Sequence, residues 1–176
     1  RATDAQRRGD VFVPMHWNDG FAADARIGKL IAGETDPVSG QPALKMARAS
    51  VTRFVAELYG FAVTRTRPLL DMPYWAVAKV KGGWRTEFAI SSFDGDAEQT
   101  ARQCFSQAGQ NELVSYQDLR RGDWRFAAVS DGELTGVVYL SRDPVSVARS
   151  WAAELLGESQ ADISALLAGR PGAGKI

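Results

Sequence analysis

The sequence predicts a mixed fold, in which a β-rich segment is followed by a small α+β domain with an antiparallel sheet. Two pairs of strand-like runs joined by glycine-containing turns predict the sheet, and helical patterns after each pair predict the α+β class. A short apolar run, Val11–Met15, predicts a strand near the start. We expect two units, 1–54 and 74–168, with a linker over 55–73.

Composition sets the first limits on function. The 176 residues suffice for one ordinary domain or two small ones. With 21 basic and 21 acidic residues, the formal net charge is zero, which gives no electrostatic reason to expect a nucleic-acid or anionic-membrane partner. No apolar run approaches the roughly 20 residues that a transmembrane helix needs.

The start of the chain and its single cysteine indicate where the protein works. The first eight residues are polar and lack both a Met and the apolar core of a signal peptide, so we expect a piece of a longer protein. Cys104 has no second cysteine with which to form an internal disulfide. We therefore expect a cytoplasmic protein without a membrane partner.

Turn chemistry divides the first segment. Pro14 ends the predicted strand Val11–Met15, and residues 18–20 are typical of a turn. The run from Asp36 to Pro42 combines Pro, Ser and Gly, which favour tight turns. A second strand is expected within residues 47–59.

The linker over 55–73 is expected because charged residues and prolines interrupt any periodic pattern there. Beyond it, Lys81-Gly82-Gly83 joins the predicted strands Tyr74–Val80 and Trp84–Ile90. Asp131-Gly132 similarly joins Trp124–Val129 to Leu134–Leu140, with a further strand over 116–119.

Two or three helices are expected to complete the α+β domain. Asp94-Gly95-Asp96 offers capping residues for a helix that continues to Gly109, with one apolar face: Ala97, Ala101, Cys104, Phe105 and Ala108. Asp143-Pro144 predicts the start of a second helix, with Asp as cap and Pro in the first turn. Its expected apolar face is Val145, Ala148, Trp151, Ala152 and Leu155. A short helix is expected over 160–168.

Residues with catalytic potential are few. Gly169–Lys175 matches the spacing of a phosphate-binding P-loop, but a helix precedes it, Ile176 replaces the Ser or Thr, and a linker is favoured. Cys104 lacks a nearby base, because the only His is at position 16, and we expect it in the core. One His without further ligands makes no zinc site. The residues alone predict no self-contained catalytic site.

Two blocks resemble a known family. Gly-Asp-Val-Phe-Val-Pro-Met-His-Trp at 9–17 and Thr-Asp-Pro-Val-Ser-Gly-Gln-Pro-Ala-Leu-Lys at 35–45 resemble the C-terminal end of assimilatory nitrate reductases. These enzymes belong to the molybdopterin oxidoreductase (dimethyl-sulfoxide-reductase-like) superfamily. The resemblance is strong over 8–53 and weaker over 55–176, where Leu166–Gly172 resembles a linker that precedes a small [2Fe-2S] domain.

The resemblance implies a fold. Residues 1–54 would be the C-terminal part of the molybdopterin-dinucleotide-binding domain, a partial double-psi β-barrel. Residues 74–168 would be an accessory domain, and 169–176 a linker toward a missing [2Fe-2S] domain. Because the rest of the same polypeptide would complete the barrel, we expect unpaired edges or exposed apolar surface in residues 1–54.

The resemblance also implies a reaction. The complete enzyme would reduce nitrate to nitrite at molybdenum held by two molybdopterin guanine dinucleotides, with the chemistry supplied by the cofactor. A [4Fe-4S] cluster and in some members a [2Fe-2S] cluster, both in parts of the protein not present here, would carry electrons. The donor would be an NADH-dependent flavoprotein, ferredoxin or flavodoxin. This portion would help to hold the cofactor and would be inactive alone.

The resemblance assigns five residues to cofactor binding. Met15, His16 and Trp17 would approach the cofactor or the substrate funnel, and Lys45 matches a lysine that contacts the anionic pterin. Gly28 stands where the family usually has an Asn, so a backbone group or Arg26 would substitute, or the pterin contact is weaker. Surface exposure is the alternative for Lys45, and core packing for His16 and Trp17.

Two other functions stay open. The chain could belong to another molybdopterin oxidoreductase, such as a formate dehydrogenase, which nitrate and formate turnover would distinguish. It could also be a non-catalytic module that docks an electron-donor protein, an alternative that Gly28 favours.

Overall fold

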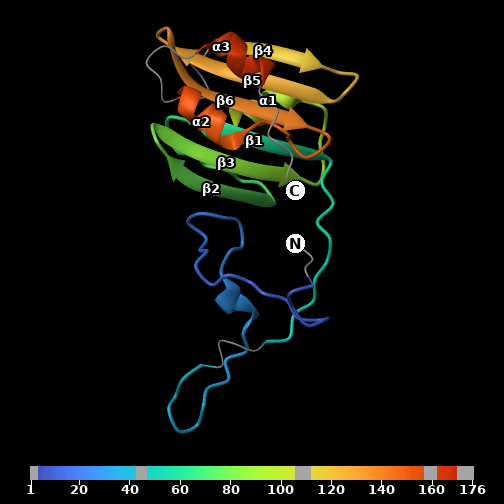
Figure 1. The fold of residues 1–176 in the computed structure, drawn as a ribbon, viewed down its shortest axis with the longest axis vertical. Coiled ribbons are helices and arrows are strands. Elements are labelled where there is room, and N and C mark those ends of the chain that lie inside the picture. The colour runs from blue at the N-terminus through green and yellow to red at the C-terminus, as the bar shows by residue number, and fades with distance from the viewer. Residues whose placement is uncertain (1–3, 43–46, 106–111, 157–161, 170–176) are drawn as a thin grey trace. The chain divides into compact units, whose positions relative to one another are not determined.

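The computed structural model describes residues 4–42, 47–105, 112–156 and 162–169. The chain divides into two compact units, Arg1–Arg53 and Phe54–Ile176 (Figure 1). Regular secondary structure within the described residues is concentrated in the second unit.

The second unit is one antiparallel sheet with helices on both faces (Figure 1). The strands lie in the order β2-β3-β1-β6-β5-β4. Their bounds are β1 Leu58–Thr64, β2 Tyr74–Val80, β3 Gly83–Ile90, β4 Glu112–Asp118, β5 Asp123–Ser130 and β6 Glu133–Ser141. The helices are α1 Ala97–Arg102, α2 Arg149–Leu156 and α3 Ile163–Ala168. The sequence-based expectation of an α+β domain with an antiparallel sheet is confirmed.

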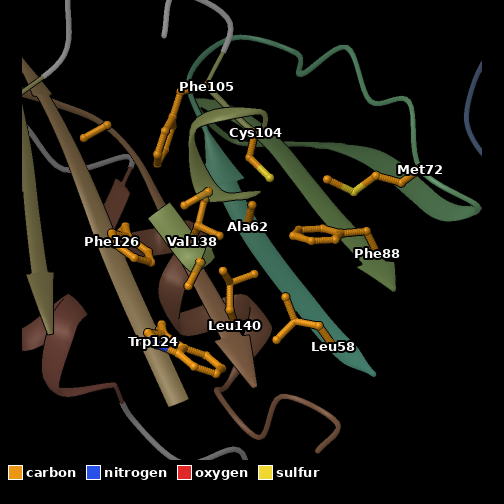
Figure 2. Packing of buried hydrophobic residues seen from close by; sticks show 13 residues of the cluster. Leu58, Ala62, Met72, Phe88, Cys104, Phe105, Trp124, Phe126, Val138 and Leu140 are labelled. Atoms are coloured by element: carbon orange, nitrogen blue, oxygen red, sulfur yellow. The ribbon is translucent and has the colours of Figure 1, made fainter. Parts of the chain in front are cut away.

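Each face of the sheet carries its own apolar core. The first core lies against α1, and Figure 2 shows Ala62 and Val138 at its centre, between Phe88 and Phe126. The second core lies against α2 and α3 and includes Phe61, Val137, Tyr139, Leu156 and Leu166. Because side chains alternate along a strand, β1 and β6 supply neighbouring residues to opposite cores.

Strand β1 is the centre of this arrangement. It pairs with β3 on one side, from Leu58↔Ile90 to Thr64↔Trp84, and with β6 on the other. Leu58, Phe61 and Val63 are fully buried. At Gly60 the ring of Phe88 lies against the backbone, and a Cβ there would stand 2.0 Å from Phe88 Cζ. Glycine is therefore required by a close approach rather than by a turn.

The position of β1 corrects one expectation. The segment 55–73 was expected to be a linker, but it contains β1, one of the two central strands of the sheet. β1 is apolar on both faces, so it lacks the alternation of polar and apolar residues by which half-buried strands are recognised. The prolines and arginines that suggested a linker begin only after Thr64. The strand expected within 47–59 begins at Leu58, near the end of that range.

Both predicted hairpins are confirmed. Lys81 and Gly82 connect β2 to β3, and Gly82 has a φ of +80°. Asp131 and Gly132 connect β5 to β6 with φ values of +52° and +79°. Positive φ at both central residues is the geometry that right-twisted strands favour.

The helices differ from expectation in their bounds. Asp96 caps α1 by accepting a hydrogen bond from the Gln99 N–H at 2.8 Å, as expected, but α1 ends at Arg102. Four of the five residues of its expected apolar face, Ala97, Ala101, Cys104 and Phe105, are buried, and Ala108 lies outside the described residues.

The helix expected to begin at Asp143-Pro144 begins instead at Arg149. The Arg149 guanidinium donates to the carbonyls of Val145 and Val147 at 2.7 and 2.6 Å, so the side chain satisfies groups that a helix would have used. Val147 is buried in the second core. The expected apolar face is therefore split: Ala152 is buried in α2, whereas Val145 and Ala148 precede the helix.

The described part of the first unit contains no strand. Its elements are the 3-10 helix η1 (Ile27–Leu30) and a single bridge between Thr35 and Pro42. The expectation of a strand over Val11–Met15 is wrong, and a double-psi barrel is not confirmed. The expected turns at 18–20 and 36–40 are confirmed by backbone hydrogen bonds, Phe21 N to Asn18 O and Gly40 N to Asp36 O.

Large apolar side chains are exposed throughout the described part of the first unit. Phe12 is 72% exposed, and the described residues of this unit include none that is fully buried. Other large apolar side chains are exposed as well: Val11, Val13, Met15, Trp17, Phe21, Leu30, Val38 and Val51. A strand with nothing to pack against or pair with gains too little to offset its lost conformational entropy. The expected exposed apolar surface is confirmed.

We predict that Gly60→Ala destabilises the second unit by about 1–3 kcal/mol, because the new methyl group collides with the Phe88 ring. Urea denaturation measures the loss. In a Phe88→Leu background the smaller side chain relieves the collision, so the penalty of Gly60→Ala should shrink. Equal penalties in both backgrounds would show that Phe88 is not its cause.

Candidate functional site

The residues assigned by resemblance begin with Met15, His16 and Trp17, which lie on the surface of the first unit. All three are exposed, Met15 by 52% and Trp17 by 51%. Within the part of the chain that the structure describes, His16 and Trp17 make no hydrogen bond, ion pair or ring contact. Core packing within this unit, the alternative for His16 and Trp17, is therefore not seen. An imidazole and an indole are available here to a ligand or to another surface.

Gly28 lies in η1 and faces open space. No atom outside its immediate neighbours lies within 4 Å of where its Cβ would be. The nearby cations are already paired: Arg26 Nε lies 2.8 Å from Asp19 Oδ2, and Lys29 Nζ lies 3.3 Å from Asp24 Oδ1. Arg26 is thus held by a carboxylate in this geometry, which weakens its case as the substitute for the family's Asn.

Only one of the two carboxylate oxygens of Asp19 has a partner among the described residues. Its Oδ2 contacts Arg26, but its buried Oδ1 accepts no hydrogen bond from any described residue. A buried acceptor without a donor costs free energy, so such an atom indicates a missing partner. The sequence alone did not identify Asp19, because nothing in its neighbourhood sets it apart from other surface acids.

The loop from Thr35 to Pro42 closes on itself. The Asp36 carboxylate accepts hydrogen bonds from the Val38 and Ser39 N–H groups at 3.0 and 2.7 Å and from the Ser39 hydroxyl at 2.9 Å. These donors, the Ser39 N–H foremost, hold the pKa of Asp36 below its ordinary value. The loop is therefore a preformed turn, and it leads toward Lys45, which lies outside the described residues.

The assigned residues that the structure describes are not joined to one another by side-chain contacts. Met15, His16 and Trp17 are consecutive, whereas within the described residues no hydrogen bond or ion pair joins them to Gly28. In the same described part, no group of three or more His, Cys, Asp or Glu side chains could hold a metal ion. Nor is any helix found there that is both long and apolar enough to cross a membrane.

The second unit contains a polar contact that sequence reasoning missed. The Tyr139 hydroxyl donates to the Leu166 carbonyl at 2.8 Å, and the Arg125 guanidinium donates to the carbonyls of Leu167 and Ala168. Burial raises the pKa of Tyr139, which keeps it a donor. These bonds hold the C-terminal end of α3 against β5 and β6. They join residues far apart in sequence, so no local pattern reveals them.

Cys104 is confirmed as a core residue. It is fully buried among the residues of the first core (Figure 2). Burial raises the pKa of its thiol to about 12, so the nucleophilic thiolate is absent near neutral pH. Its environment fits packing and not catalysis.

We predict that this thiol makes stability depend on alkaline pH. As the pH rises above about 9, the unfolded chain releases the Cys104 proton while the folded protein retains it up to about 12. The free energy of unfolding therefore falls across this window, by up to about 1.4 kcal/mol per pH unit for one proton. Below pH 9 the thiol causes no pH dependence.

Urea denaturation of the parent protein and of Cys104→Ala from pH 8 to 11 measures this contribution. In Cys104→Ala the free energy of unfolding should fall less steeply with rising pH, because the thiol proton is missing. Tyr139 is present in both proteins and contributes equally to each. Identical slopes would show that Cys104 is not protected from ionisation.

Comparison with known proteins gives one informative match. No family model matches the chain, and no solved structure matches it. The chain is 38% identical to a protein named nitrate reductase from Klebsiella oxytoca over 80 residues, which cover 45% of this chain and 9% of that protein. The chain thus spans a small part of its relative. The similarity supports a relationship to nitrate reductases, which are oxidoreductases.

Proposed function

We propose that this chain is the C-terminal portion of a molybdenum-dependent assimilatory nitrate reductase, which reduces nitrate to nitrite. In this proposal residues 1–54 are part of the molybdopterin-dinucleotide-binding domain and help to hold the cofactor. The portion is not catalytic by itself, and the iron–sulfur clusters and molybdenum ligands belong to the rest of the polypeptide. The similarity to a nitrate reductase is the observation that carries the proposal.

The surface of the first unit supports the cofactor-binding role. Its apolar side chains are exposed over Val11–Val13, as is expected of a piece whose packing partner lies elsewhere. A chain of this composition that folded as an independent domain would bury these apolar side chains. We therefore infer that another part of the same polypeptide covers this surface.

In this proposal the side chains of the first unit form one side of a site for a pterin dinucleotide. Trp17 and His16 present aromatic rings to solvent, and the buried Asp19 Oδ1 needs a donor, which the exocyclic amino groups of pterin and guanine carry. The space around Gly28 lets backbone approach a ligand closely. Lys45 supplies a cation for the pyrophosphate. When bound, the molybdenum cofactor supplies the two-electron reduction of nitrate.

Variants of the complete protein test the proposal. We expect Lys45→Ala and His16→Ala to lower the molybdenum and pterin content of protein from molybdate-limited cells, with a loss of nitrate reduction. Loss of one charge-assisted hydrogen bond corresponds to roughly tenfold weaker binding or more. Molybdenum is measured by mass spectrometry, pterin by its fluorescence after oxidation, and activity by nitrite formation.

Lys79→Ala is the matched control, because Lys79 is an exposed lysine of the second unit and has no proposed cofactor contact. It should retain cofactor and activity. Unchanged cofactor content in both test variants overturns the assignment of Lys45 and His16. Formate oxidation without nitrate reduction would instead support the formate dehydrogenase alternative. A complete protein that contains neither molybdenum nor pterin would support the alternative of a non-catalytic module that docks an electron-donor protein.

A further inference from the structure

A pocket in the second unit lies between the β2–β3 hairpin and α2. Its volume is about 600 Å³, within the range of small-molecule sites. One wall comes from the hairpin, including Lys81 and Arg85, and the other from α2, including Arg149, Ser150 and Ala153. None of these residues has a part in the proposed nitrate-reductase function.

Arg85 is the unusual residue of this pocket. Its side chain is half-buried, yet it makes no hydrogen bond or ion pair with any described residue. Its cross-strand neighbours are apolar, Val63 on β1 and Ala78 on β2. A guanidinium carries five donors, and none of those of Arg85 is used by a described residue. Arg85 therefore lines the pocket with its donors available to a ligand.

The nearest carboxylate along β3, that of Glu87, already forms an ion pair with another residue. Glu87 lies two residues from Arg85 on the same face of β3. Both of its oxygens bind Arg149, Oε1 to Nε at 2.8 Å and Oε2 to Nη2 at 3.0 Å. This bidentate pair neutralises Glu87 and fixes Arg149, so Glu87 is not available to pair with Arg85.

The other polar groups of the pocket are a second cation, a hydroxyl and a carboxylate. Lys81 stands in the hairpin turn, makes no ion pair within the described residues, and adds a second cation. Ser150 offers a hydroxyl from the first turn of α2. Val80 and Ala153 give apolar wall. Glu154, exposed at the rim, supplies an acceptor for a hydroxyl or amino group of a ligand.

We propose that the pocket between the β2–β3 hairpin and α2 binds a small organic phosphate, with Arg85 and Lys81 as its charge partners. A phosphate monoester is a dianion near neutral pH and matches two unpaired cations, and a guanidinium fork binds it through two hydrogen bonds. The apolar walls fit an organic group on the phosphate. The proposal rests on the second unit and is independent of the nitrate-reductase proposal.

Calorimetric titration of the 176-residue chain tests the site. The probes are phenyl phosphate, inorganic phosphate and benzoate, at low salt. We expect phenyl phosphate to bind more tightly than inorganic phosphate, which lacks the apolar group, and than benzoate, which carries a single charge. Arg85→Gln should weaken phenyl phosphate binding at least tenfold, and Arg85→Lys by less.

Lys79→Gln is the matched control, because Lys79 lies on the same strand as Ala78 but points to the opposite face of the sheet. It should bind phenyl phosphate as the parent does. Lys81→Gln is a second test variant in the turn, where a change of side chain leaves the core intact. Equal losses in Lys79→Gln and Lys81→Gln would reveal non-specific charge attraction and overturn the site. No binding of any probe up to 10 mM, as an order-of-magnitude limit, would overturn it also.

Discussion

Burial of β1 on both faces is the constraint on which the second unit depends. A strand flanked by β3 and β6 and apolar above and below needs two cores, and therefore helices on both faces of the sheet. The β2–β3 hairpin and the β4–β5–β6 meander are local structures that β1 joins into a single sheet. The close approach of the Phe88 ring to Gly60 shows how tightly β1 and β3 pack against each other.

The Arg149 side chain transmits this constraint to the neighbouring surface. It lies over the ring of Phe61 on β1, with 4.5 Å between Cζ and the ring centroid, and binds Glu87 on β3. It also satisfies two carbonyls of the segment before α2, which places the start of that helix. The Arg149 guanidinium thus connects β3, the preceding loop and α2. Because it binds both carboxylate oxygens of Glu87, that residue is not available as a partner for Arg85. The fold of the core and the charge of the pocket are therefore linked.

Features set by local chemistry could be predicted from the sequence. Two-residue turns with glycine identified both hairpins, and Asp96 identified the start of α1. β1 was missed because a strand buried on both faces has no alternating pattern and because its two partners lie far away in sequence. The helix expected at Asp143 begins instead at Arg149, whose side chain binds the Val145 and Val147 carbonyls and also Glu87 on β3, and the Glu87 contact is too distant in sequence to be read from a local pattern.

The candidate site could be predicted only in part, for a related reason. The resemblance to nitrate reductases names Met15, His16, Trp17, Gly28 and Lys45. Under the proposed function, the side chains that would complete the site come from other segments. The structure places four of these residues, all exposed, and adds Asp19, whose unpaired oxygen is visible only in three dimensions. Arg85 escaped notice similarly, since an arginine is ordinary until its surroundings are known to lack an acceptor.

The pairing of β1 with β6 has a consequence for the order in which the protein is made. Synthesis must proceed from Thr64 to Glu133 before the second partner of β1 even begins to leave the ribosome. At roughly 5–20 residues per second this takes roughly 3–14 seconds, far longer than a hairpin needs to form. During that interval β1 can pair with β3, but its other edge stays open and both its apolar faces lack their full cover. The nascent chain must therefore survive a period in which its most apolar strand is the edge of an unfinished sheet.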